Sequence, residues 1–159
     1  MSRTRSTARR RASVAIFASF TMLFALAQAP AASAGSSRKL LRIVNETRTD
    51  HGLRPLGLDR SLNPPSRRHT NRMIRDNRIY DPPNLTQILA GYDYDHLGAD
   101  VVGCGHTLRE LHRILMTESF HRTILLHEDL RKVGIGVVVN DRNNRCGRGS
   151  FWATEIFYG

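Results

Sequence analysis

One run of residues near the C-terminus constrains the fold more than any other segment. Residues 133–139 read Val-Gly-Ile-Gly-Val-Val-Val, which is β-branched, dotted with glycine and free of charge. This composition is typical of a strand near the centre of a sheet. Residues 141–145 have the composition of a turn, and residues 151–157 place alternate side chains on one face. The sequence therefore predicts a β-hairpin in this region.

Helical periodicity dominates the chain before this hairpin. Leu40 and Val44 fall on one face of a helix expected at residues 38–51. A second helix is expected to begin near Asn63, because the two prolines that follow suit a first helical turn. Helices followed by a hairpin predict an α+β domain, with helices covering an antiparallel sheet.

Two further features complete the expected fold. Residues 91–105 hold several glycines and are predicted to form a loop. Thr107 and Glu110 then form a capping box, which starts another helix. The predicted core joins apolar residues of helices and sheet, namely Leu40, Val44, Leu56, Met73, Leu89, Leu111, Leu115, Ile135, Val137 and Ile156.

Residues 1–34 have the pattern of a secretory signal peptide. A basic stretch with five arginines and no acid precedes an uncharged apolar stretch, and Ala32-Ser33-Ala34 supplies a cleavage site. The alternative is a membrane anchor, but the strongly apolar part is shorter than the roughly 20 residues that a span needs. We therefore expect cleavage after Ala34 and a secreted, extracellular protein. Residues 35–159 would form a single domain without a transmembrane segment.

Export determines how the two cysteines are interpreted. In an oxidising compartment, Cys104 and Cys146 are expected to form a disulfide bond. The alternative is metal ligation, since His106 lies two residues after Cys104. That spacing alone is a weak zinc signal, because no second ligand pair follows at zinc-finger spacing.

The formal net charge of +10 is unevenly placed, because the first 34 residues contribute five of the positive charges. The second helix has a basic outer face, formed by Arg67, Arg68, Arg72 and Arg75. Aromatic residues are not interleaved with these arginines, so the pattern favours a solvated face and no nucleic-acid partner.

Common catalytic motifs are absent from the sequence. There is no His-Glu-x-x-His pair, no Gly-x-Ser-x-Gly elbow and no Gly-Lys-Ser or Gly-Lys-Thr phosphate loop. A cysteine nucleophile is not expected if both thiols are bridged. Among the seven histidines, His121 is distinctive because it lies between two apolar helical segments.

The order of motifs over residues 38–159 resembles the CAP superfamily, or SCP domains, and most of all its short bacterial secreted branch. This superfamily includes cysteine-rich secretory proteins, antigen 5 and pathogenesis-related plant proteins. The matching stretches, in chain order, are residues 41–48 with 52–56, Leu62 with His69 and Met73, Asn84-Leu85, residues 98–101, His121-Arg122, residues 133–136 and residues 152–157. The resemblance implies a three-layer α-β-α sandwich with a small antiparallel sheet and an open cleft.

In many members of the superfamily, two histidines and two acidic residues line that cleft, and the histidines can hold zinc. Here His121 matches the second histidine. The first is replaced, with Asp81 as the main candidate and Tyr80 as the other. Ala99 stands in the position of one acid, and Asp100 follows it in the position of an asparagine.

The resemblance therefore implies a cleft lined by His121, Asp81 and Asp100, with Glu118 nearby but unplaced. Three arrangements remain open for His121 and Asp81: a hydrogen-bonded pair, no contact, or a metal site.

The altered cleft favours a secreted, non-enzymatic binding module without a cofactor or catalytic residues. The expected ligand is lipid, cell-wall material or another protein, and the protein is expected to be a monomer. The alternative is a metal-dependent hydrolase or protease that uses the cleft around His121, with His121 and Asp81 as candidate zinc ligands.

Overall fold

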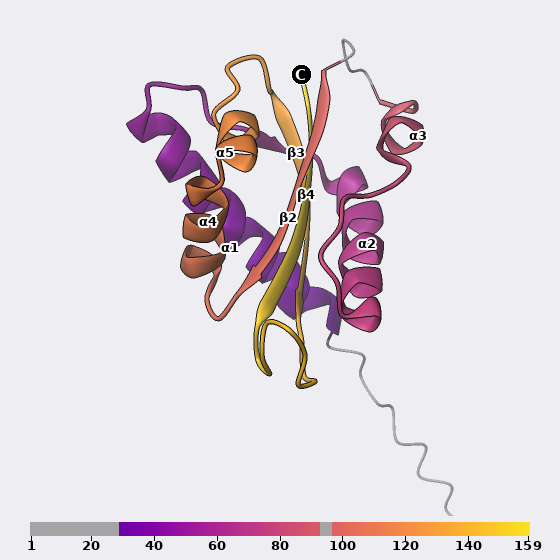
Figure 1. The fold of residues 1–159 in the computed structure, drawn as a ribbon. Helices are drawn as coiled ribbons and strands as arrows, with labels where there is room; N and C mark the ends of the chain where they lie inside the picture. The colour runs from indigo at the N-terminus through magenta and orange to yellow at the C-terminus, as the bar shows by residue number, and fades with distance from the viewer. Residues whose placement is uncertain (1–28, 93–96) are drawn as a thin grey trace, which may run out of the picture.

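The computed structural model describes residues 29–92 and 97–159 (Figure 1). Its helices are α1 (Ala29–Asp50), α2 (Asn63–Asp76), α3 (Leu85–Leu89), α4 (Leu108–Thr117) and α5 (Ser119–Leu125), with a 3-10 turn at Arg60–Leu62. Its strands are β1 (Gly57–Leu58), β2 (Gly98–Gly105), β3 (Lys132–Val139) and β4 (Phe151–Tyr158).

The predicted signal peptide falls mainly on residues 1–28, which lie outside the described residues. The remaining residues of that segment begin α1, which starts nine residues before the predicted helix. Within the described ranges, no helix is both long enough and apolar enough to span a membrane.

The sheet has the order β1-β3-β4-β2. The predicted hairpin is confirmed, because β3 and β4 pair antiparallel, and β3 lies inside the sheet as expected. Strand β1 pairs parallel with β3, so the sheet is mixed rather than wholly antiparallel.

The loop predicted at residues 91–105 is wrong for its second half. Residues 98–105 form β2, which pairs antiparallel with β4 along its full length. The glycines that suggested a loop instead allow close approach of α4. A Cβ at Gly103 would lie 3.0 Å from a methyl group of Leu115, and one at Gly105 would lie 2.7 Å from the Leu111 nitrogen.

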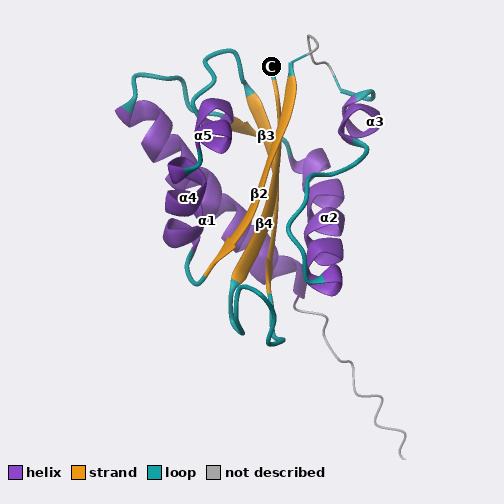
Figure 2. Ribbon diagram, viewed as in Figure 1, coloured by secondary structure: helices purple, strands orange, loops and turns teal. Residues whose placement is uncertain are grey.

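Helices cover both faces of the sheet (Figure 2), which confirms the three-layer α-β-α arrangement. Helices α1, α4 and α5 lie on one side, and α2 and α3 lie on the other. Along β4, Trp152 packs with Met73 of α2, while Phe157 belongs to the core beneath α1 and α4. All ten residues of the predicted core are buried.

Two ionisable residues, Arg48 and Glu155, are also fully buried. Arg48 of α1 donates hydrogen bonds to the backbone oxygens of Arg54, Leu125 and His127, and thereby ties α1 to the chain after α5. Glu155 lies in the middle of β4, and burial raises its pKa to about 8.

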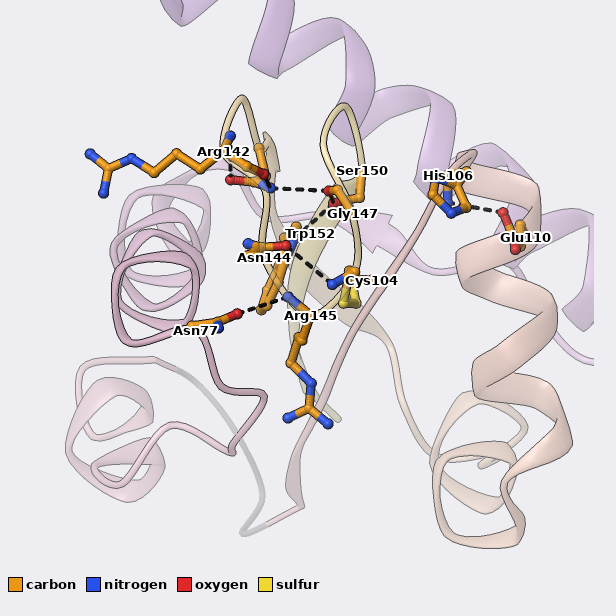
Figure 3. The surroundings of a disulfide bond; sticks show 12 residues. Asn77, Cys104, His106, Glu110, Arg142, Asn144, Arg145, Gly147, Ser150 and Trp152 are labelled. Carbon is orange, nitrogen blue, oxygen red and sulfur yellow. Dashed lines mark hydrogen bonds between the residues drawn. A yellow bond between two sulfur atoms is a disulfide. The ribbon is translucent and has the colours of Figure 1, made fainter.

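The predicted disulfide bond is present between Cys104 and Cys146, whose Cα atoms are 6.3 Å apart. Figure 3 shows that it ties β2 to the loop between β3 and β4. Asn144 Oδ1 accepts a hydrogen bond from the Cys146 nitrogen at 3.1 Å. The Arg145 nitrogen donates to Asn77 Oδ1 at 2.9 Å, so the same loop is also joined to the end of α2.

Candidate functional site

A cavity of about 330 Å³ lies beside the first residues of β2. The large side chains of its apolar wall come from four parts of the chain and are Leu85, Leu97, Phe120, Ile124 and Leu130. Its polar side chains are Asp81, Asp100 and His127. The volume is at the lower end of the roughly 300–1,000 Å³ found in small-molecule sites.

Asp100 is held in the cavity wall by β2, where it pairs in register with Ile156 of β4. Its Oδ2 atom is buried and has no hydrogen-bond partner among the described residues. Burial raises the pKa of Asp100 to about 7, and the negative charge of Asp81 adds to this effect. Asp100 is therefore partly protonated near neutral pH.

Asp81 lies in the segment between α2 and α3, which His69 fixes in place. The buried His69 ring contacts the Tyr80 backbone oxygen through Nε2 at 2.7 Å and packs edge-on against the Tyr80 ring. Burial lowers the pKa of His69, so the ring is neutral at physiological pH. His69, which the sequence places only on a helix face, thus positions the segment that carries Asp81.

His121 belongs to α5, and its neighbours Phe120 and Ile124 line the cavity, but His121 itself does not. Its Nδ1 atom lies 2.8 Å from Oε2 of Glu118, one turn earlier. The contact is a close approach of ring and carboxylate, because His121 Nδ1 has no hydrogen-bond partner among the described residues. The pairing of His121 with Asp81 stays a prediction.

The donor set does not fit a zinc ion. Across residues 29–92 and 97–159, no three side chains of His, Cys, Asp or Glu are grouped so that they could hold a metal. Structural and catalytic zinc sites use at least three such ligands. Cys104 is engaged in the disulfide bond, so it cannot act together with His106 as a metal ligand.

Sequence reasoning missed the apolar side of this site. Phe120 is 68 % exposed, which is unusual for a large apolar side chain. An apolar residue directly before His121 was the available signal. Leu85, Leu97 and Leu130 are far apart in the chain, and only the tertiary fold brings them to one cavity.

Comparison with known proteins identifies one family. The profile described as "Cysteine-rich secretory protein family" (CAP) matches residues 41–157. A comparison with curated protein sequences gives no match.

Three solved structures share the fold. An extracellular SCP-domain protein from Bacillus anthracis has 21 % identity and a TM-score of 0.62, and the match covers 79 % of this chain and 41 % of that one. An outer surface protein from Borrelia burgdorferi has 14 % identity and a TM-score of 0.62, with 79 % and 94 % covered. A cysteine-rich secretory protein from Staphylococcus aureus has 22 % identity and a TM-score of 0.59, with 79 % and 39 % covered.

This chain therefore spans less than half the length of two of these three proteins. The family profile, however, extends over most of the chain and reaches from α1 to β4. The chain belongs to the cysteine-rich secretory protein (CAP) family.

Proposed function

We propose that this protein is an extracellular, non-enzymatic binding module that takes a small, partly apolar ligand into the cavity beside α5. The observation that carries the proposal is the cavity itself, in which five apolar side chains face a small number of polar groups. This combination is typical of small-molecule binding sites. Among the ligands expected from sequence, it favours a lipid-like molecule.

An extracellular location is supported by three independent features. The signal-peptide pattern of residues 1–34 predicts export. The Cys104–Cys146 disulfide suits an oxidising compartment. Two proteins of similar structure are an extracellular protein from Bacillus anthracis and an outer surface protein from Borrelia burgdorferi.

A second candidate function is hydrolysis, which the contact between Glu118 and His121 favours. A carboxylate beside an imidazole is an arrangement found in general acid–base catalysis. Against it, the donor set does not fit a metal, and His121 is not among the residues that line the cavity. Binding is therefore the better-supported function.

The test is a titration of the purified residues 35–159 with the uncharged fluorescent probe N-phenyl-1-naphthylamine. Transfer of the probe into the cavity should raise its fluorescence and shift the emission to shorter wavelength. Ile124→Arg places a charge in the cavity wall and should weaken binding at least tenfold. Thr123→Arg, at the exposed neighbouring position on α5, is the matched control and should bind as the unmodified protein does.

The competing function is tested in parallel with ester and peptide substrates, with and without added zinc. Turnover that disappears in His121→Ala would overturn the binding-module proposal in favour of hydrolysis. No probe binding in the unmodified protein, or equal binding by the two α5 variants, would contradict the role of this cavity.

A further inference from the structure

We propose that the cavity selects an amphiphile with an amine at its polar end, whose ammonium group meets the carboxyl groups of Asp81 and Asp100 while its alkyl chain packs on the apolar wall. This inference rests on the proposed function, because it names the class of ligand for the same site.

The polar part of the lining is acidic. Asp81 and Asp100 both line the cavity, and the described lining residues include no lysine or arginine. The two carboxyl groups interact electrostatically, because the negative charge of Asp81 helps to raise the pKa of Asp100. His127 is the other ionisable side chain among the described lining residues, and none of these residues provides a fixed positive charge for an anionic headgroup. The cavity therefore disfavours fatty acids and phosphate esters.

Asp100 lacks a partner that an ammonium group would supply. Its Oδ2 atom is buried and accepts no hydrogen bond in the part of the chain that the structure describes. A buried polar atom without a hydrogen-bond partner is destabilising, because it has lost its contact with water and gained nothing in return. An ammonium group has three N–H donors and a positive charge, so it satisfies the unpaired oxygen and favours the ionised form of Asp100.

The apolar wall supplies the second half of the recognition. Leu85 of α3 and Ile124 of α5 line the same cavity as the two carboxyl groups, and Leu130 precedes β3. An alkyl chain gains affinity for each CH₂ group that this wall removes from water. A bare divalent cation would gain nothing from this wall. The combination of acid and apolar surface thus favours an organic cation over a metal ion.

The experiment compares decylamine, decanol and decanoate, each below its aggregation concentration. Each competes with N-phenyl-1-naphthylamine for the purified residues 35–159 at pH 8. The three compounds share one chain length and differ in headgroup charge. Decylamine should bind at least tenfold more tightly than decanol, and decanoate should bind more weakly than both.

Substitution then locates the selectivity. Asp81→Asn and Asp100→Asn should each lower the ratio of decylamine to decanol affinity toward one. Asp50→Asn removes an exposed acid at the end of α1, outside the cavity, and should keep the unmodified ratio. Because the ratio is measured on one preparation, partial misfolding of a variant affects both compounds equally.

The pH dependence gives a second readout. Ionisation of Asp100 between pH 6 and pH 8 should strengthen decylamine binding several-fold and leave decanol binding almost constant. Asp81 and His127 also line the cavity, so the pH dependence must become weaker in Asp100→Asn to support the inference.

The outcomes separate the two proposals. Equal affinities for decylamine and decanol, or tighter binding of decanoate, would overturn the amine selectivity and leave the binding function standing. Displacement of decylamine by millimolar calcium chloride, but not by sodium chloride of equal ionic strength, would overturn it in favour of a cation site. Binding of none of the three compounds would contradict the proposed function itself.

Discussion

Glu155 of β4 pairs in register with Ile135 of β3, and neither of its carboxyl oxygens has a hydrogen-bond partner among the described residues. On its other side stands Val101 of β2. The carboxyl group is thus enclosed in the apolar layer beneath α1 and α4, where an ionised form is strongly disfavoured.

This arrangement predicts that stability falls as the pH rises. The pKa of Glu155 is about 8 in the folded protein and close to 4.5 when the side chain is exposed. Below pH 4.5 both states hold the proton. Between these values the unfolded chain loses its proton while the folded protein keeps it, so the free energy of unfolding decreases with pH. The free energy of unfolding should fall by about 1.4 kcal/mol for each pH unit in this range, and thus by several kcal/mol in total.

Urea denaturation from pH 5 to pH 8 measures this slope. Glu155→Gln cannot ionise and should flatten it, although the buried amide lowers stability at pH 5. Glu128→Gln, at an exposed position, is the control and should retain the slope. Asp100 also lowers the free energy of unfolding as the pH rises, but by less, because its pKa is raised as well. An unchanged slope in Glu155→Gln would show that the carboxyl group is solvated.

Removal of the disulfide bond should lower the free energy of unfolding by about 2–5 kcal/mol. The bond joins residues separated by 42 positions, so the reduced unfolded chain gains considerable freedom. The double variant Cys104→Ala/Cys146→Ala and the dithiothreitol-treated protein should show similar losses in urea denaturation. If reduction lowered the free energy of unfolding strongly and the double substitution did not, the free thiols would cause the effect, and not the missing bond.

Replacement of Gly136 by alanine should destabilise the protein by about 3 kcal/mol or more. A Cβ atom at this position of β3 would overlap the backbone of Ser66 and Arg67 at the start of α2. The neighbouring helix would have to move as a unit, because backbone atoms cannot rotate away. Gly91→Ala, where no atom lies within 4 Å of the added carbon, is the matched control. Thermal denaturation of the two variants should therefore differ by many degrees.

Zinc binding near neutral pH should be weaker than micromolar in calorimetric titration. The ring of His121 contacts Glu118, and the residues described in the structure provide no third ligand beside them. His121→Ala should therefore leave the weak binding isotherm unchanged. Micromolar affinity that disappears in this variant would revive the hydrolase interpretation.

Much of the fold was predictable because its signals are local. The glycine-dotted β3, the prolines at the start of α2 and the Thr107 cap each depend on neighbouring residues. The cap is present, with Thr107 Oγ1 accepting from the Glu110 nitrogen at 3.0 Å. Strand β2 was missed because its pairing with β4 depends on residues about fifty positions later, which no local pattern of glycines reveals.

The site was predictable only in part, for the same reason. Asp81 and Asp100 were expected in one cleft through the family resemblance, and both line the cavity. The contact of His121 with Glu118 follows helical spacing and could have been found from the sequence. The apolar wall could not have been predicted from the sequence, because it exists only when α3, α5 and the start of β2 are packed together.

The strand order has a consequence for when the protein can fold. Strand β4 lies between β2 and β3 in the sheet. These two earlier strands therefore cannot join one sheet until residues 151–158, which form β4, have been synthesised. Until then, β3 can pair only with the short β1, and β2 has no partner strand, so the sheet cannot close over a core. Completion of the sheet is thereby delayed to a late stage of synthesis, after the helices and the other strands have left the ribosome.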